Sequence, residues 1–223
     1  IERLLGKGGM GEVYLARQIS MDRAVALKIL SAQLRSDKDS TDRFMQEVRV
    51  LAKMEHPHIV AAYEAGEDGG VLFLAMGYVQ GQSLEERIKH EGCLGWKDAC
   101  GITRKLAGAL AYAWDKHRML HRDIKPANVL LDGDGEPKLV DLGLAKSLGP
   151  CEGLTMSGTI MGTPNYMSPE QIEARGDLDF RTDMYALGAT LWHMLTGQKP
   201  YQGSSLMDTL RKQAAEPLED PRQ

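Results

Sequence analysis

Short apolar runs separated by glycine-rich turns fill the N-terminal part of the chain, and apolar residues at helical spacing prevail after about residue 80. Apolar runs bounded by turn residues predict strands, whereas spacings of i, i+3 and i+4 predict amphipathic helices. The predicted strands cover residues 3–5, 13–16, 24–30, 71–76, 129–131 and 137–140. The predicted helices cover about 41–54, 96–117 and 183–195, and a shorter one starts after Ser83. The pattern indicates a strand-rich first portion and a mainly helical second one.

Composition and charge narrow the class of protein. The 223 residues include 27 basic and 31 acidic ones, and the resulting net charge of −4 argues against a dedicated nucleic-acid binder. No apolar run reaches the roughly 18 residues that a membrane span needs. The three cysteines fit neither a metal site nor a disulfide framework, and the first residues carry no signal peptide. We therefore expect a globular, cytoplasmic chain with reduced thiols, no membrane segment and no nucleic-acid partner.

Residues 121–128 read His-Arg-Asp-Ile-Lys-Pro-Ala-Asn and precede an apolar run. A lone His-x-Asp would be an ordinary solvated loop, but the whole octet resembles the catalytic loop of protein kinases. In that family Asp123 would accept the proton of the substrate hydroxyl, Asn128 would bind magnesium, and Lys125 would lie beside the same phosphate. The spacing suits this chemistry, because a base and a metal ligand must both reach the transferring phosphate.

Residues 5–13 contain the pattern Gly-x-Gly-x-x-Gly, which dinucleotide-binding folds also carry. Those folds need a helix after the glycines, whereas strands are predicted here on both sides. A Walker A loop is excluded because no Gly-Lys-Ser/Thr follows. The segment is therefore similar to the kinase hairpin that covers the phosphates of ATP, in which glycines let backbone amides approach. The resemblance implies nucleotide contacts from Leu5, Gly6, Gly8, Gly11 and Val13.

A lysine stands inside the apolar run of residues 24–30. A buried lysine is costly unless anions pair with it, and the ordinary alternative is a solvent-facing lysine on an edge strand. The run resembles the kinase Val-Ala-Ile-Lys strand, so Lys28 would contact the α- and β-phosphates and Ala26 would line the nucleotide site. Glu47 lies next to the apolar stripe of the helix at 41–54. It is either an exposed helix acid or, by the same resemblance, the partner of Lys28.

Residues 71–81 resemble the last strand of the small kinase lobe and the hinge that follows it. Met76 would then guard the back of the adenine pocket, and Gly77 and Val79 would offer backbone groups to the adenine edge. Leu130 is a further candidate contact from the second portion. Most relatives have an acidic residue where Gly77 stands, so we expect a looser hinge at this point.

Residues 141–143, Asp-Leu-Gly, occupy the place of the kinase Asp-Phe-Gly sequence. Asp141 would bind a magnesium ion that bridges the β- and γ-phosphates, and the leucine would keep an apolar anchor. Asp183 opens the apolar helix at 183–195, where a carboxylate needs partners. In kinases this residue holds the backbone of the catalytic loop.

Residues 162–170 resemble the substrate-docking loop of kinases, with Ser168 in place of the alanine of Ala-Pro-Glu. Thr163 would hydrogen-bond near Asp123 and Lys125, a pattern that favours Ser/Thr over Tyr acceptors. The loop before it holds three candidate phosphorylation sites, although ordinary loop polarity would also explain them. They are Thr155, Ser157 and Thr159, and the first two are preferred from their spacing before residue 162. Arg122 would pair with such a phosphate.

The chain is thus identified as a member of the eukaryotic-like serine/threonine protein kinases, most similar to the bacterial type. The resemblance implies an α+β bilobal kinase fold, with an N-lobe at 1–79 and a partial C-lobe at 80–223. It implies ATP and Mg²⁺ as cofactors (Mn²⁺ could replace magnesium), protein substrates with Ser/Thr acceptors, and dimerisation as a route to trans-autophosphorylation.

The alternatives are an ATP-binding pseudokinase or scaffold fragment and an antibiotic phosphotransferase of similar fold. The latter would not be expected to carry Lys125-Pro126 or the segment 163–170. The chain stops where a complete kinase would continue, so we expect a fragment. In relatives a later helix supplies an arginine for Glu170, and without it Glu170 is expected to be buried and unpaired.

Overall fold

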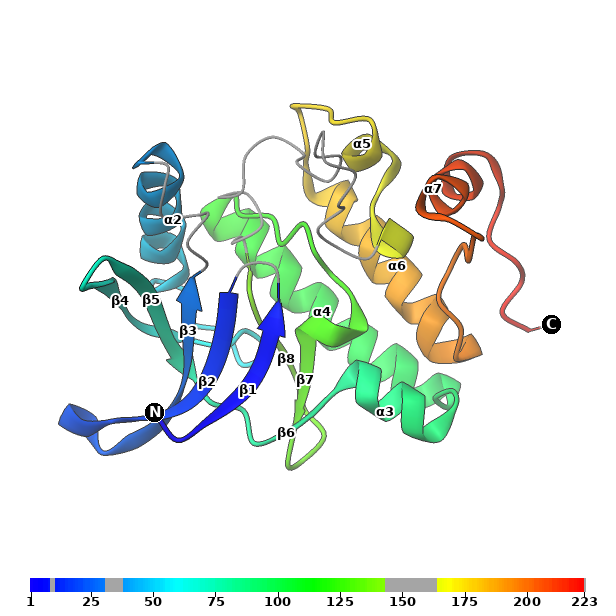
Figure 1. The fold of residues 1–223 in the computed structure, drawn as a ribbon. Coiled ribbons are helices and arrows are strands. Elements are labelled where there is room, and N and C mark those ends of the chain that lie inside the picture. Colours follow the sequence, from blue (N-terminus) through cyan, green and yellow to red (C-terminus); the bar gives the residue numbers. More distant parts are fainter. Residues whose placement is uncertain (9–10, 31–37, 143–163, 223) are drawn as a thin grey trace.

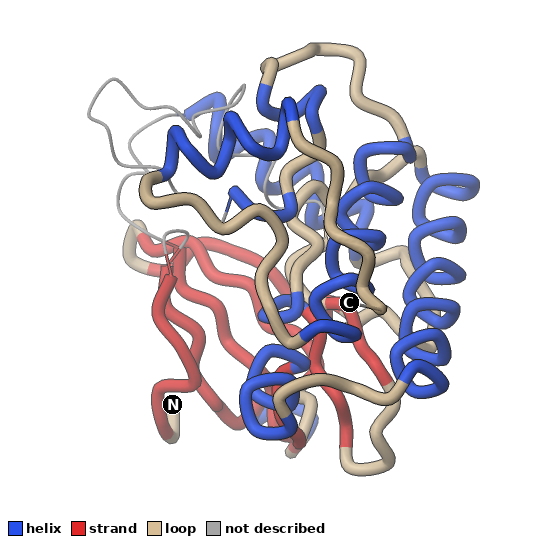
Figure 2. Tube along the Cα trace, turned by 90° about the vertical axis from the view of Figure 1, so that its right-hand side faces the viewer, coloured by secondary structure: helices blue, strands red, loops and turns tan. Residues whose placement is uncertain are grey.

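The computed structural model describes residues 1–8, 11–30, 38–142 and 164–222. The strands and most of the helices form two portions that meet along the middle of the molecule (Figure 1). Figure 2, turned by 90°, shows the strands gathered on one side and most helices on the other. This arrangement matches the predicted α+β architecture.

The first portion is a five-stranded antiparallel sheet in the order β1-β2-β3-β5-β4. Its strands are β1 (Arg3–Gly8), β2 (Gly11–Gln18), β3 (Arg23–Leu30), β4 (Ala62–Asp68) and β5 (Val71–Gly77). A short 3-10 helix, η1 (Ile19–Met21), joins β2 to β3. Helix α2 (Lys38–Leu51) packs beside β4, so it lies at the end of the sheet away from β1. The hydrophobic pattern missed β4, whose sequence Ala-Tyr-Glu-Ala-Gly-Glu-Asp has few apolar residues.

The second portion is built around two long helices. Helix α4 (Trp96–His117) packs against α6 (Phe180–Thr196), and α3 (Leu84–Glu91) lies beside them (Figure 1). The predicted capping box of α3 is present: Ser83 accepts from the backbone N–H of Glu86, and Glu86 accepts from that of Ser83. Helix α6 ends at Gly197, whose φ of 72° gives the expected left-handed stop.

Short elements complete the second portion. They are the strands β6 (Gly81–Ser83), β7 (Val129–Asp132) and β8 (Pro137–Leu139), the 3-10 helices η2 (Pro126–Asn128) and η5 (Pro164–Tyr166), and the helices α5 (Pro169–Ile172) and α7 (Leu206–Ala215). The three strands form a small sheet in the order β6-β7-β8. The sequence analysis did not predict β6, α5 and α7, which are short elements.

The two portions share backbone hydrogen bonds and a common core. Val60, just before β4, donates its N–H to the carbonyl of Leu139 at 2.9 Å, and Leu139 donates to the carbonyl of His58 at 2.9 Å. Leu51 at the end of α2 belongs to the same buried cluster as Leu142 and the α4 side chains. The segment between α2 and β4 therefore fixes that helix against the helical portion.

We expect Leu106→Ala to lower the free energy of unfolding by about 2–5 kcal/mol, because Leu106 is fully buried on α4 and its loss leaves a cavity. Urea denaturation followed by circular dichroism measures this loss. Arg104→Ala, an exposed position on the same helix, is the control and should change stability by less than about 0.5 kcal/mol. Equal losses in both variants would contradict the assignment of α4 as the central core helix.

Candidate active site

One carboxylate of α6 fixes the loop at residues 121–128. Asp183, 4% exposed, accepts the backbone N–H of His121 on Oδ2 and that of Arg122 on Oδ1, both at 2.8 Å. Burial raises the pKa of Asp183, and the two backbone hydrogen bonds oppose that effect. The loop needs this support because Arg122 has a φ of 68°, which an L-residue seldom adopts unaided. The predicted grip of Asp183 on the loop is present in the structure.

The imidazole of His121 connects the same loop to the end of β8. Its Nε2 lies 3.0 Å from the carbonyl oxygen of Val140, and its Nδ1 accepts the N–H of Asp123 at 3.4 Å. A carbonyl oxygen only accepts, so Nε2 carries the proton and both contacts are met by one neutral tautomer. The N–H of Val140 in turn donates to the carbonyl of Asn128 at 3.1 Å. Residue 141 is thereby placed beside both ends of the loop.

Three predicted catalytic side chains converge within this loop. Lys125 Nζ lies 2.9 Å from Oδ1 and 2.8 Å from Oδ2 of Asp123. Asn128 Nδ2 donates to Oδ2 of Asp123 at 2.8 Å and to its carbonyl oxygen at 2.7 Å. Because the amide nitrogen of Asn128 is used within the loop, its Oδ1 is the atom suited to a cation. The Asp123 carboxylate is about one-third exposed, so it is open to an incoming group.

Lys28 forms a side-chain ion pair between the sheet and the helical portion. Its Nζ lies 2.8 Å from Oδ1 of Asp141, and the side chain is only 4% exposed. A buried ammonium needs such an anion, so the interpretation of Lys28 as a solvent-facing edge lysine was wrong. Asp141 itself has a φ of 60°, a strained conformation that turns it toward the lysine strand. The pairing of Lys28 with Glu47, which is half-buried on α2, stays a prediction.

The predicted adenine-pocket residues from the sheet gather in a second apolar cluster. Ala26 and Met76 are buried in it, and Val13 and Val79 pack against it. Leu130, on β7, is half-buried and opposite Ser83 in the small sheet. The N–H of Gly77 donates to the carbonyl of Ala61 at 2.9 Å, so this N–H is already used within the protein.

Gly77 faces a side chain that sequence reasoning did not single out. A Cβ at Gly77 would lie 3.3 Å from the Tyr63 hydroxyl and 3.6 Å from Val60. The Arg23 guanidinium lies 3.4 Å from the centre of the Tyr63 ring and holds it in place. Tyr63 therefore takes the room that a side chain at residue 77 would use. No hydrophobic pattern in β4 pointed to this tyrosine.

The glycines of the β1–β2 hairpin differ in what requires them. A Cβ at Gly11 would lie 1.9 Å from the carbonyl oxygen of Ile29, so the fold itself demands glycine there. At Gly6 and Gly8 nothing lies within 4 Å of the added carbon. Leu5 beside them is partly exposed. The open space at Gly6 and Gly8 fits a ligand that approaches the hairpin backbone.

The segment after the undescribed residues returns to the catalytic loop. The Gln171 side chain donates to the carbonyl of Arg122 at 2.9 Å, a contact that sequence reasoning missed. The predicted residues Thr163, Thr155, Ser157 and Thr159 lie outside the described residues.

The expectation that Glu170 is buried and unpaired was wrong. Its carboxylate is half-buried and accepts the hydroxyl of Thr182 at 2.8 Å. Burial alone would raise the pKa of Glu170. Hydrogen bonds from its own backbone N–H, Thr182 and Ser168, with the charge of Arg175, outweigh burial and lower the pKa below its ordinary value.

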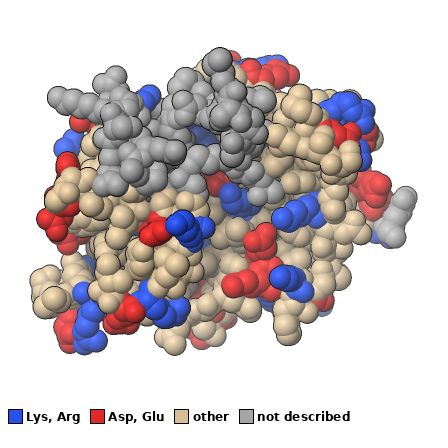
Figure 3. All heavy atoms as spheres, viewed as in Figure 1, with Lys and Arg blue, Asp and Glu red and all other residues tan. Residues whose placement is uncertain are grey.

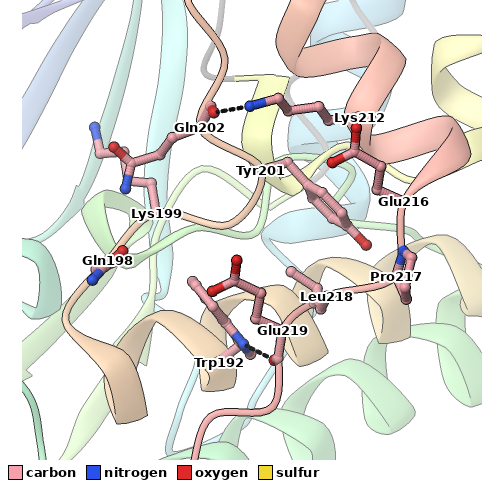
Figure 4. Close-up of a pocket in the computed structure, with 10 residues that line it drawn as sticks. All are labelled: Trp192, Gln198, Lys199, Tyr201, Gln202, Lys212, Glu216, Pro217, Leu218 and Glu219. Carbon is pink, nitrogen blue, oxygen red and sulfur yellow. Dashed lines mark hydrogen bonds between the residues drawn. The ribbon is translucent and has the colours of Figure 1, made fainter. Parts of the chain in front are cut away.

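Two surface features lie apart from this site. Basic and acidic side chains are interspersed over the described part of the face in Figure 3, without a broad area of one sign. A pocket of about 190 Å³ lies between α6 and the segment around α7, lined by residues such as Trp192, Tyr201 and Lys212 (Figure 4). It contains none of the predicted site residues.

Within the described residues, no helix is both long and apolar enough to cross a bilayer.

A strand-rich portion with a buried lysine is joined to a helical portion that carries two carboxylates and an amide, an arrangement typical of phosphotransferases of the protein-kinase class. The family model for the protein kinase domain matches residues 1–221, and the chain belongs to that family. Members of this family use ATP and a divalent metal ion and phosphorylate proteins.

The most similar curated proteins compared are bacterial serine/threonine-protein kinases. PrkC of Bacillus subtilis is 39% identical over 213 residues, which are 95% of this chain and 32% of PrkC. PknK of Mycobacterium tuberculosis is 41% identical over 225 residues, 98% of this chain and 20% of PknK. The chain therefore spans a third or less of the length of these relatives.

Solved structures show the same fold. The crystal structure of the Mycobacterium tuberculosis PknI kinase domain, in a cysteine-to-alanine mutant form, matches with a TM-score of 0.73 and 33% identity. The match covers 90% of this chain and 75% of the PknI chain. The predicted bilobal kinase fold is confirmed, as is the resemblance to bacterial serine/threonine kinases.

We expect Asp183→Asn to lower the free energy of unfolding by roughly 1.5–3 kcal/mol, because asparagine offers one acceptor oxygen where two backbone N–H groups need one each. Chemical denaturation measures the loss. Asp177→Asn, an exposed acid just before the same helix, controls for the change in net charge. A midpoint equal to that of the control would show that Asp183 does not hold the loop.

Proposed function

We propose that the chain is an ATP-dependent protein kinase domain that phosphorylates serine and threonine hydroxyls. The observation that carries the proposal is the cluster of Asp123, Lys125 and Asn128 beside Asp141, which reaches the buried Lys28. A partly exposed carboxylate, two cations and an amide oxygen in one place suit the transfer of a charged phosphoryl group. We place the boundary between the proposed lobes after residue 79, in the segment that joins β5 to β6.

ATP and a divalent cation fit the residues present. The open space at Gly6 and Gly8 admits phosphates near the hairpin, and Lys28 supplies a buried positive charge. Carboxylate and amide oxygens are ligands that Mg²⁺ accepts, so Asp141 and Asn128 would hold magnesium, or manganese in its place. The bound Mg–ATP supplies the γ-phosphoryl group. Ala26, Met76, Val13 and Leu5 would surround the adenine and ribose end.

The hinge residues would add polar contacts to the apolar ones. The carbonyl of Gly77 and the backbone of Val79 would bind the adenine edge, and Leu130 would contact the ring from the second lobe. Glu47 would hold Lys28 on the phosphates once they replace part of the Lys28–Asp141 contact.

Within the chain, Asp123 would orient the acceptor hydroxyl and take its proton. Oδ1 of Asp123 accepts from Lys125, whereas Oδ2 accepts from both Lys125 and Asn128, so Oδ1 is the better placed base. Lys125 would also offset the charge that develops on the phosphoryl group. Lys125 and Thr163 together favour serine and threonine as acceptors.

Regulation would follow from the loop before residue 164. We propose Thr155 and Ser157, and after them Thr159, as autophosphorylation sites, with two copies of the domain meeting in a transient dimer. A phosphate there would pair with Arg122, the residue that precedes Asp123 in the chain. A kinase needs a compartment that supplies ATP, so we place the domain in the cytoplasm. The substrates of the longer protein would be proteins with accessible Ser/Thr side chains.

The second candidate is an ATP-binding scaffold without turnover. The Lys28–Asp141 and Lys125–Asp123 contacts favour it in part, because these ion pairs occupy the groups that catalysis would use. Both pairs are partly exposed on the acidic side, however, so incoming phosphates and a cation can replace them. We therefore favour the active kinase.

Intact-mass measurement of the purified chain before and after Mg–ATP tests the proposal. Phosphate increments should appear on the wild type and fall by about 10²–10⁴-fold in rate for Asp123→Asn, which removes the base. Asp134→Asn, an exposed acid in the β7–β8 turn, is the matched control and should behave as the wild type. A Mg-dependent thermal shift by ATP without increments would favour the scaffold, and neither signal would contradict both functions.

Peptide mapping of the phosphorylated wild type should locate phosphate on Thr155 and Ser157. The double variant Thr155→Ala/Ser157→Ala should lose most of the mass increment, because it removes the two preferred acceptor hydroxyls. Cys151→Ala, four residues before Thr155, adds no hydroxyl and serves as the control. Phosphate confined to residues outside 155–159 would contradict the assigned sites.

A further inference from the structure

The segment at residues 164–171 lies against α6 and α7 and connects them to the catalytic loop. Asn165 and Tyr166 are both buried on η5. They belong to the segment that we expect an acceptor protein to contact. The far end of the segment is fixed by Ser168 and Gln171, which share a capping box, and Gln171 also donates to Arg122. The position of this segment relative to Asp123 thus depends on what holds its near end.

Three side-chain contacts hold the near end. Asn165 Nδ2 donates to the carbonyl of Pro200 at 2.7 Å, Tyr166 Oη lies 2.6 Å from His193 Nδ1, and Gln213 Nε2 donates to the carbonyl of Met167. These partners come from the loop after α6, from α6 itself and from α7. The segment is therefore held by three separate elements.

The loop that receives Asn165 is itself fixed. Lys212 on α7 donates to the carbonyl of Gln202 at 2.9 Å, and Trp192 on α6 donates to that of Glu219 at 2.9 Å (Figure 4). A displacement of α6 would reach the segment through His193, and one of α7 would reach it through Gln213 and through the loop at residues 200–202.

Of the three contacts, only the one between Tyr166 and His193 depends on a side chain that can gain a proton near neutral pH. His193 is 5% exposed, and its ring stacks on that of Tyr166 with centroids 6.1 Å apart. Burial lowers the pKa of His193, and Lys199 lowers it further, whereas Glu85 opposes them. Burial also raises the pKa of Tyr166, so near neutral pH the phenol O–H donates to the unprotonated Nδ1.

Protonation of His193 would reverse this hydrogen bond. An imidazolium Nδ1 only donates, so the Tyr166 O–H would have to turn elsewhere inside a buried site. The charged groups that act on His193 among the described residues are Lys199, from the loop after α6, and Glu85, from α3; the two lie 3.7 Å apart. Their opposite charges offset each other, so the new imidazolium would lack a strong anionic partner.

We propose that His193 is a positioning residue for acceptor proteins, acting through Tyr166 to keep residues 164–171 in place beside Asp123. The ligand class is an extended Ser/Thr-containing segment of the acceptor, and the inference rests on the proposed kinase function. Nucleotide contacts come from other residues, such as Lys28 and Asp141. Loss of the His193 contact therefore weakens acceptor use and leaves ATP binding intact.

Steady-state kinetics with Mg–ATP and the best acceptor from an array of degenerate Ser/Thr peptides test the proposal. His193→Ala should raise the KM for the peptide about five- to thirtyfold, the effect of one lost buried hydrogen bond, with the KM for ATP within about twofold of the wild type. His193→Asn places an amide atom where Nδ1 stood and should recover most of the loss. Tyr166→Phe should match His193→Ala, since both remove the same bond.

A matched control comes from the same helix. Thr190 is fully buried on α6, and within the described residues its hydroxyl has no hydrogen-bond partner. Thr190→Val should therefore keep wild-type constants for both substrates. A peptide KM for His193→Ala equal to that of Thr190→Val would overturn the proposal. Equal rises in the KM for peptide and the KM for ATP would also overturn it, since a merely structural residue would affect both substrates.

The pH dependence provides a second readout. The folded pKa of His193 lies below its ordinary value of 6.5, so the unfolded chain binds a proton more readily than the folded one. Stability is therefore lost as the pH falls below 6.5, and the folded protein keeps the neutral imidazole to a lower pH than the unfolded chain does. The peptide KM of the wild type should rise only at acidic pH, below 6.5, and His193→Asn should lack this rise. An identical acid limb in both proteins would contradict the role of His193.

Failure of the function and failure of the inference are distinguishable. ATP hydrolysis without peptide is measured beside peptide phosphorylation. A wild type that does neither contradicts the proposed kinase and the inference together. A wild type that phosphorylates the peptide, with His193→Ala unchanged, contradicts the inference alone.

Discussion

The contact on which the candidate site depends is the pair of hydrogen bonds from the backbone of His121 and Arg122 to Asp183. A carboxylate buried at the start of α6 is stable only if donors surround it, and the loop needs an anchor because Arg122 has a positive φ. The same two hydrogen bonds give the carboxylate its donors and give the loop its anchor. Because α6 packs on α4, Asp183 holds the loop in a fixed position. Asp123, Lys125 and Asn128 then make their contacts within that loop.

Two further connections bring the rest of the site to this loop. The neutral imidazole of His121 binds the carbonyl of Val140 and so places Asp141, which pairs with the buried Lys28 of the sheet. On the other side, Gln171 binds the carbonyl of Arg122 and brings in the segment held by Tyr166 and His193. The proposed nucleotide-binding residues and the proposed acceptor-binding segment are thus connected to the loop at residues 121–128 through different hydrogen bonds. This separation is why changes on one side are expected to leave the other largely intact.

The sequence predicted the parts of the site whose chemistry is local. The octet at 121–128, the lysine of β3, the capping box at Ser83 and the bounds of α4 all follow from short-range patterns, because periodicity and spacing record them directly. It could not predict partners that meet only in the folded chain. Tyr63 beside Gly77, Gln171 on Arg122 and Thr182 on Glu170 join residues from different elements, and β4 carries too few apolar residues to reveal itself. The expectation of an unpaired Glu170 was wrong for this reason.

Amide hydrogen exchange at His121 and Arg122 tests most directly whether Asp183 holds the loop in the ligand-free chain. If it does, these two N–H groups should exchange only through global unfolding, with the same free energy as the core amides of α4. The asparagine of Asp183→Asn would retain one acceptor oxygen, so at least one of the two N–H groups should become fast in this variant while the α4 amides that exchange locally are unchanged. Exchange of both amides in the wild type at the rate of an exposed loop, such as the β7–β8 turn, would contradict the account.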